Sequence, residues 1–188
     1  AETEKFAHIT YFFNGGEKEP FPLEERTLVP SPRDVATYDL KPEMSAYEVT
    51  EKLLLALDEN KYTFFLVNYA NPDMVGHTGN FSAATQAIET IDICIGKILK
   101  KCADNQITVV LTADHGNCDQ MAYDDGTPHT SHTMAPTPFA IFDPRLKNVP
   151  LALNPSTDQW ALKDVAPTIL HLLGIEIPHD YIGKPIFK

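Results

Sequence analysis

The sequence has little of what marks a membrane protein, a secreted protein or a nucleic-acid-binding protein. None of its apolar runs approaches the roughly 18 residues that cross a bilayer. Its first residues, AETEKFAHIT, contain no apolar core preceded by basic residues, as a signal peptide would. Against 26 Asp and Glu there are only 15 Lys and Arg, and the formal charge of -11 argues against nucleic acid or an anionic membrane as a partner. We therefore expect a cytoplasmic protein.

Cysteines are few as well. The three, Cys94, Cys102 and Cys118, are odd in number and show no CxxC spacing, which argues against a disulfide framework and a structural zinc cluster. The 188 residues, with 43% hydrophobic and 22% charged, suit one globular domain.

A chain this acidic needs a local source of positive charge if it is to bind phosphate, and bound divalent cations are one such source.

The hydrophobic pattern predicts alternating strands and helices. We expect strands at 6–13, 62–67, 107–111 and 138–142, with at most one short strand near 27–29 in a proline-rich stretch. Helices are expected at 45–58, 81–102 and 162–173, the first with Ser45 as N-cap and Glu48 as its capping-box partner. Strand, helix, strand across 62–111 predicts an α/β fold of three layers, α/β/α, with a largely parallel sheet.

Two polar loops follow buried strands of this predicted sheet. NYANPDMVGHTGN, with Asp73 and His77, comes after the strand at 62–67, and TADHGN, with Asp114 and His115, comes after the strand at 107–111. Open α/β sheets bind their ligands at the carboxyl ends of strands. We therefore expect the two loops to meet at one sheet edge.

Glycines favour the convergence of these side chains. Gly76 and Gly79 loosen the first loop, so that its aspartate and histidine can turn toward one point. Asp114 and His115 are neighbours, and neighbours on a regular strand face opposite sides. They converge only where the strand has ended, and Gly116 allows that turn.

A third cluster, PHTSHT, adds His129 and His132 ahead of the last predicted strand. Taken singly, a loop aspartate is usually a turn residue, and a lone histidine is usually solvated. Together at one sheet edge, carboxylates and imidazoles indicate a site for a first-row divalent ion, because calcium prefers oxygen ligands alone.

The roles of two further residues each allow two interpretations. Lys5 could neutralise phosphate or be a solvated charge. Asn117, which follows the DHG turn, could orient a ligand or only accommodate the turn.

The blocks AETEKFAH, VPSPRDVATYDLKPEMSA, NYANPDMVGHTG, TADHGN and PHTSHT stand in the order and spacing seen in cofactor-independent phosphoglycerate mutases, members of the alkaline phosphatase superfamily. The sequence resembles this family from Ala1 to near its C-terminus. The resemblance implies an alkaline-phosphatase-like fold. It also implies that residues 1–188 are the C-terminal portion of the metal-binding phosphatase domain, incomplete because the N-terminal part is missing.

The resemblance implies two metal sites. The ligands of one would be Asp73, His77 and His132, with His129 as the alternative third ligand because spacing alone does not separate the two histidines. Part of the second site would be Asp114 and His115. The expected ions are manganese, with magnesium or cobalt as alternatives, and Lys5 resembles a lysine that contacts the active centre.

The activity implied is that of an isomerase which interconverts 3-phosphoglycerate and 2-phosphoglycerate through a phosphoserine, in glycolysis and gluconeogenesis. The full-length enzyme would be a monomer that binds these small molecules. Its nucleophilic serine and one aspartate ligand have no counterpart in this sequence, so the chain alone is expected to be inactive. The alternatives are a phosphopentomutase or metal-dependent hydrolase of the same superfamily, and a catalytically silent metal-binding domain.

Overall fold

The computed structural model describes residues 1–146, 153–154 and 160–187. Two compact units make up the chain. The first comprises Ala1–Asn105 with His115–Pro136, and the second comprises Gln106–Asp114 with Thr137–Lys188.

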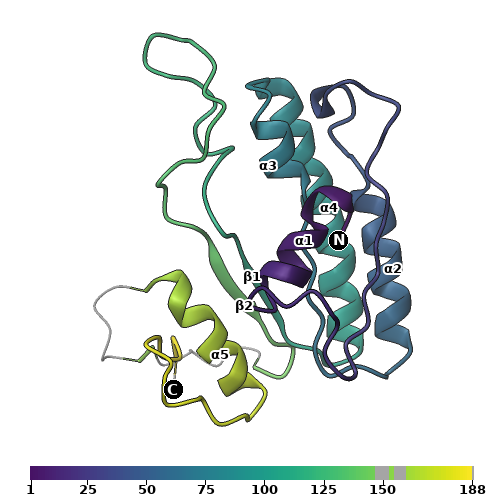
Figure 1. Cartoon of the computed structure of the whole chain (residues 1–188), viewed down its shortest axis with the longest axis vertical. Coiled ribbons are helices and arrows are strands. Elements are labelled where there is room, and N and C mark those ends of the chain that lie inside the picture. Colours follow the sequence, from purple (N-terminus) through teal and green to yellow (C-terminus); the bar gives the residue numbers. More distant parts are fainter. Residues whose placement is uncertain (147–152, 155–159, 188) are drawn as a thin grey trace. The chain divides into compact units, whose positions relative to one another are not determined.

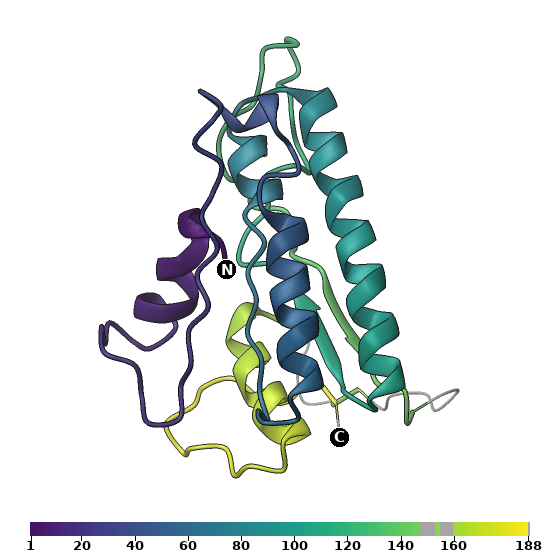
Figure 2. The ribbon, with the colours of Figure 1, turned by 90° about the vertical axis from the view of Figure 1, so that its right-hand side faces the viewer.

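The first unit is helical. Its elements are α1 (Thr3–Ala7), a π-helical segment (His8–Phe12), a 3-10 turn (Tyr38–Leu40), α2 (Ala46–Asp58), α3 (Asn71–Gly76) and α4 (Phe81–Asp104). The long helix α4 packs against both α2 and α3, and α2 runs beside it in Figure 2. The core between them consists of small and flexible side chains, namely Met44, Ala70, Val75, Ala83, Ala84, Ala87 and Met121.

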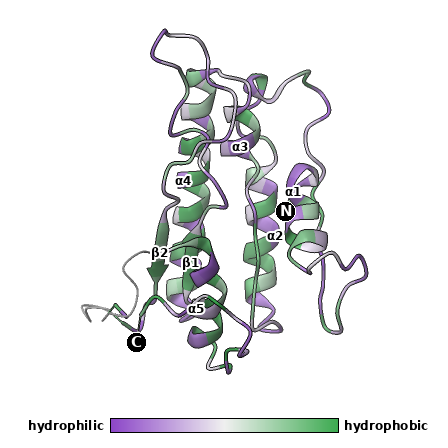
Figure 3. Ribbon diagram, turned by 60° about the vertical axis from the view of Figure 1, so that its left-hand side comes forward, coloured by the Kyte–Doolittle hydropathy of each residue, from purple (hydrophilic) through white to green (hydrophobic). Residues whose placement is uncertain are grey.

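Helix α4 confirms the predicted helix at 81–102. Its N-cap is Asn80, whose side chain accepts a hydrogen bond from the Ala83 amide at 3.2 Å. On this helix Phe81 and Ile88 are exposed, while Ala83, Ala84 and Ala87 are buried. Small residues let neighbouring helices approach closely. Figure 3 shows that hydrophobic and hydrophilic residues are mixed along α4.

Helix α2 confirms the predicted helix at 45–58, but its capping box is absent. Ser45 makes no side-chain cap and instead donates its hydroxyl to the Pro30 carbonyl at 2.7 Å. The Ser45 amide donates to the carboxylate of Glu2 at 3.4 Å. The N-terminus of α2 is therefore bound by a distant carboxylate instead of by its own Glu48.

The strand predicted at 6–13 is wrong, because this segment is helical. The Asn14 amide donates to the Thr10 carbonyl at 2.8 Å, and the Thr10 hydroxyl donates to the Phe6 carbonyl at 2.7 Å. The aromatic residues of this segment favoured a buried strand, but Phe12 and Phe13 are exposed, so their apolar character does not indicate burial. A turn follows this segment at Gly15 and Gly16, which have positive φ.

The segment 62–67 is extended but unpaired within the described part of the chain, so the buried strand predicted there is wrong. No backbone hydrogen bond joins it to a strand, and Phe64 and Leu66 are exposed. A buried strand needs neighbours to satisfy its amides and carbonyls. Since the described residues provide none here, they do not form the βαβ unit or the largely parallel sheet. Near 27–29 there is a single bridge, Glu2 to Val29.

The second unit contains the one sheet that the described residues form. Strand β1 (Val109–Thr112) pairs antiparallel with β2 (Phe139–Phe142), with Val109 opposite Phe142. A 3-10 turn (Leu162–Asp164) leads into α5 (Val165–Leu172), and Gly174 follows with a φ of +68°. The strands predicted at 107–111 and 138–142 and the helix predicted at 162–173 are thus confirmed, with shifted ends. No helix in the described ranges is long and apolar enough to cross a membrane.

The unpaired state of 62–67 can be measured by amide hydrogen exchange. Amides at 63–67 should exchange much faster than those in the middle of α4, because no backbone carbonyl of the described residues accepts from them. Protection of 63–67 equal to that of α4 would show that this segment is paired in solution.

Candidate metal centre

Helix α3 aligns Asp73 with His77. Pro72 lies in the first turn of this helix, a position where its missing amide hydrogen costs nothing. The His77 amide donates to the Asp73 carbonyl at 3.1 Å, so the two residues stand one helical turn apart on the same face. The expected glycine-loosened loop is thus a short helix, and helical spacing brings the two side chains together.

A hairpin brings His132 to the same point. The Thr133 amide donates to the Gly116 carbonyl at 2.9 Å, and the two residues form an antiparallel bridge. Gly116 is required for this approach, because a Cβ there would lie 2.2 Å from the Thr133 hydroxyl oxygen. The pairing sets the ring of His132 against that of His115, with centroids 3.6 Å apart and planes 19° apart.

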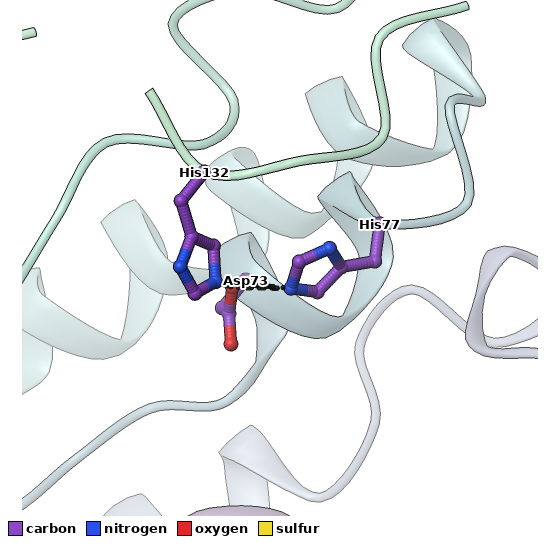
Figure 4. Close-up of side chains that lie close together, drawn as sticks. All are labelled: Asp73, His77 and His132. Atoms are coloured by element: carbon purple, nitrogen blue, oxygen red, sulfur yellow. Dashed lines mark hydrogen bonds and ion pairs between the residues drawn. The ribbon is translucent and has the colours of Figure 1, made fainter. Parts of the chain in front are cut away.

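Asp73, His77 and His132 form a compact group of possible ligands (Figure 4). Asp73 Oδ1 lies 3.0 Å from His77 Nε2 and 3.1 Å from His132 Nε2, and the two Nε2 atoms are 3.1 Å apart. Ligands at about 2.1 Å from an ion stand about 3.0 Å apart in octahedral geometry and about 3.4 Å apart in tetrahedral geometry. The observed triangle therefore fits a first-row divalent ion.

The tautomer of His77 suits a ligand. Its Nδ1 lies 2.8 Å from the carbonyl oxygen of Thr130. A carbonyl only accepts, so Nδ1 must carry the proton and donate it. The lone pair of a neutral ring then stands on Nε2, which faces Asp73, and the carbonyl fixes the orientation of the ring.

Lys5 and Asn117 hold the carboxylate of Asp73 from two sides. Lys5, which is 4% exposed, places its Nζ 2.5 Å from Oδ2, and Asn117 donates to Oδ1 at 2.8 Å. Burial alone would raise the pKa of Asp73, but the hydrogen bonds from Lys5 and Asn117 and the Lys5 charge lower it to about 2. The metal-free carboxylate is therefore ionised at neutral pH and available to a cation.

The other predicted site residues lie as follows. His129 is buried beside the Tyr123 ring, with centroids 4.7 Å apart, and its amide donates to the Met121 carbonyl. The geometry thus places His132, and not His129, against Asp73. His115 is half-buried in the first unit and Asp114 is exposed in the second unit, and their part in a second metal site remains a prediction.

Two features of the centre are not decided by the sequence. One is the backbone carbonyl of Thr130, whose role cannot be predicted from residue types because every residue has such a group. The other is Asn117, whose place directly after the DHG turn was the available signal. It lies against Asp73, which favours the reading in which it orients a ligand.

Comparison with known proteins defines the class of this chain. A model of the Metalloenzyme superfamily matches residues 1–177. The chain therefore belongs to the Metalloenzyme superfamily, and it carries a possible metal-binding triad.

Its relatives have one name in common. The chain is 50% identical over 189 residues to the 2,3-bisphosphoglycerate-independent phosphoglycerate mutase of Clostridium novyi (strain NT), a match that covers 100% of this chain and 36% of that protein. It is 52% identical over 186 residues to the enzyme of that name from Moorella thermoacetica, covering 99% of this chain and 34% of that one. The predicted resemblance to cofactor-independent phosphoglycerate mutases is thus confirmed, and the chain spans about a third of these relatives.

A solved structure extends the likeness to the fold. Leishmania mexicana phosphoglycerate mutase, determined at low cobalt concentration, matches with a TM-score of 0.90 and 33% identity. The match covers 100% of this chain and 36% of that one. The α/β, alkaline-phosphatase-like fold expected from the sequence is confirmed at this level.

The low pKa of Asp73 predicts an acid dependence of stability for the metal-free protein. Because the folded pKa is lowered to about 2 from 3.8, the stabilisation is complete above about pH 4 and is lost as pH falls toward 2. It amounts to about 2 kcal/mol. In Lys5→Met the free energy of unfolding, measured with urea in chelator, should fall less between these pH values.

The exposed Lys52 provides the matched control, since Lys52→Met removes a lysine from outside the centre. Equal pH slopes for wild type, Lys5→Met and Lys52→Met would show that Lys5 does not hold the pKa of Asp73 down.

Proposed function

We propose that this chain provides a metal site of a phosphoglycerate mutase, an isomerase that interconverts 3-phosphoglycerate and 2-phosphoglycerate through a phosphoserine. The observation that carries the proposal is the triangle of Asp73 Oδ1 with the Nε2 atoms of His77 and His132. The names of the relatives, at 50% and 52% identity, support this reaction in particular.

Manganese is the ion that we propose for this site, with magnesium or cobalt as alternatives. One carboxylate and two imidazoles form a mixed oxygen and nitrogen set that suits first-row divalent ions. The Leishmania mexicana structure, obtained at low cobalt concentration, makes cobalt the first alternative to test. A bound divalent ion supplies the positive charge that polarises phosphoryl oxygens.

The residues of the chain prepare the site for an anionic substrate. Asp73 stays ionised because Lys5 and Asn117 donate to it, and His77 presents Nε2 because the Thr130 carbonyl holds its Nδ1 proton. The Lys5 ammonium lies at Oδ2, on the far side of the carboxylate from Oδ1. A phosphoryl oxygen brought to that side would meet a fixed positive charge, and we assign Lys5 a catalytic role on this basis.

The second metal site and the nucleophile complete the proposed enzyme. Asp114 and His115 would contribute part of the second ligand set, as the resemblance to the family implies. The serine that carries the phosphoryl group would belong to the two thirds of the relatives that this chain does not span. The 188 residues, as the C-terminal portion of the phosphatase domain, would then bind metal without turning over substrate.

Metal binding tests the centre directly. Manganese titrated into the protein and followed by the electron paramagnetic resonance of the free ion should bind to the wild type. Asp73→Asn and His132→Ala should each weaken binding by more than about 100-fold, because each removes a ligand, and the loss of a residue that only holds a ligand in place already reaches that factor.

Asp92→Asn and His179→Ala change exposed residues outside the triad and serve as matched controls. Unchanged binding in Asp73→Asn or His132→Ala, or equal weakening in the controls, would contradict the centre.

Enzyme assay tests the reaction. In the complete mutase, Asp73→Ala should abolish conversion of 3-phosphoglycerate to 2-phosphoglycerate, and the 188-residue chain with manganese should show no turnover. Activity of Asp73→Ala near the wild-type level would exclude the proposed role. Turnover of a phosphopentose, or net release of phosphate by the intact enzyme, would favour another reaction of the same superfamily.

A further inference from the structure

Asn117 is bound to Asp73 by two hydrogen bonds. Its Nδ2 donates to the Asp73 carboxylate oxygen Oδ1 at 2.8 Å and to the Asp73 backbone carbonyl at 3.1 Å. The side chain is 5% exposed, and its own Oδ1 is buried and has no hydrogen-bond partner among the residues that the structure describes. An unsatisfied buried amide oxygen costs stability, so stability alone does not account for an asparagine at this position.

Gly76 provides the space that Asn117 occupies. A Cβ on Gly76 would lie 2.3 Å from Asn117 Oδ1 and 3.1 Å from Cys118 Sγ. The backbone of helix α3 at Gly76 is therefore in close contact with the side chains of Asn117 and Cys118, in the loop after the DHG turn. The Cys118 thiol adds a second attachment by donating to the Pro72 carbonyl at 2.8 Å. These contacts fix the loop against the helix that carries Asp73.

The two donors to Asp73 select the direction of its carboxylate. Lys5 is bonded to Oδ2 and Asn117 to Oδ1, and Oδ1 is also the oxygen within 3.1 Å of both imidazole Nε2 atoms. Aspartate χ2 is a soft torsion, so a carboxylate without such partners would sample many orientations. Hydrogen-bond donors that hold a metal ligand in this way orient it, and their loss typically changes metal affinity by about 10- to 100-fold.

We propose that Asn117, held in place by Gly76, is a positioning residue that orients Asp73 Oδ1 toward the metal ion. The proposal rests on the metal centre described above. It concerns a residue that acts through Asp73 and does not itself bind the ion.

Two substitutions disturb this hydrogen bond from opposite sides. Asn117→Asp keeps the shape of the side chain but replaces the amide donor by an oxygen. Gly76→Ala leaves the asparagine in the sequence but displaces it. Each should weaken manganese binding about 10- to 100-fold, and the double variant should weaken it by much less than the product of the two, because both changes act on one contact.

Matched controls are available for both changes. Asn105→Asp makes the same replacement at the exposed end of α4. Gly96→Ala changes a glycine within α4 that has no atom within 4 Å of its would-be Cβ. Both controls should bind manganese with the wild-type affinity.

The measurement is direct titration of the 188-residue protein with manganese, followed by electron paramagnetic resonance, with the folded fraction taken from thermal unfolding in chelator. Bound manganese in the variants should also show a changed zero-field splitting, which a loss of stability alone would not produce. Wild-type affinity and an unchanged spectrum in both variants overturn the proposal. So does a loss of binding that follows the folded fraction alone. Absence of manganese binding to the wild type would instead refute the metal centre itself, and the proposal with it.

Discussion

The carboxylate of Asp73 is the point at which three separate segments of the first unit meet. Lys5 comes from the N-terminal helix, His77 from α3 and His132 from the hairpin after the DHG turn, and each lies within 3.1 Å of a carboxylate oxygen. Without metal, this half-buried carboxylate lies against a lysine, an amide and two imidazoles. The hydrogen bonds from Lys5 and Asn117 and the charge of Lys5 outweigh the effect of burial and lower the pKa of Asp73 to about 2.

The groups around Asp73 suggest how an acidic chain could bind the anionic substrate that we propose for it. With a formal charge of -11 the protein repels phosphate as a whole. At the centre, the positive charge of Lys5 balances the negative charge of Asp73. The two histidines, as neutral ligands, add no negative charge. A divalent ion held there would therefore leave a net positive site, which is the electrostatic condition that phosphoryl transfer requires.

The sequence predicted which side chains lie together at the centre better than it predicted the secondary structure around them. Asp73 and His77 were predicted together from their spacing, although a short helix, and not a flexible loop, aligns them. His129 and His132 were inseparable by spacing, because the choice depends on the pairing of Thr133 with Gly116, a long-range contact. The prediction of a strand at 6–13 is wrong because aromatic residues that are typical of a buried strand are exposed here. Residues 62–67 have the composition of a strand, but the described residues provide no strand to pair with them.

The central claim is that Asp73, His77 and His132 bind one divalent ion, and anomalous diffraction from crystals of the protein grown with manganese tests it most directly. We expect a single strong peak between Asp73 Oδ1 and the two Nε2 atoms, about 2.1 Å from each, because the three atoms already form a triangle with edges of 3.0 to 3.1 Å. A strong peak elsewhere, with none at this triangle, would contradict the account.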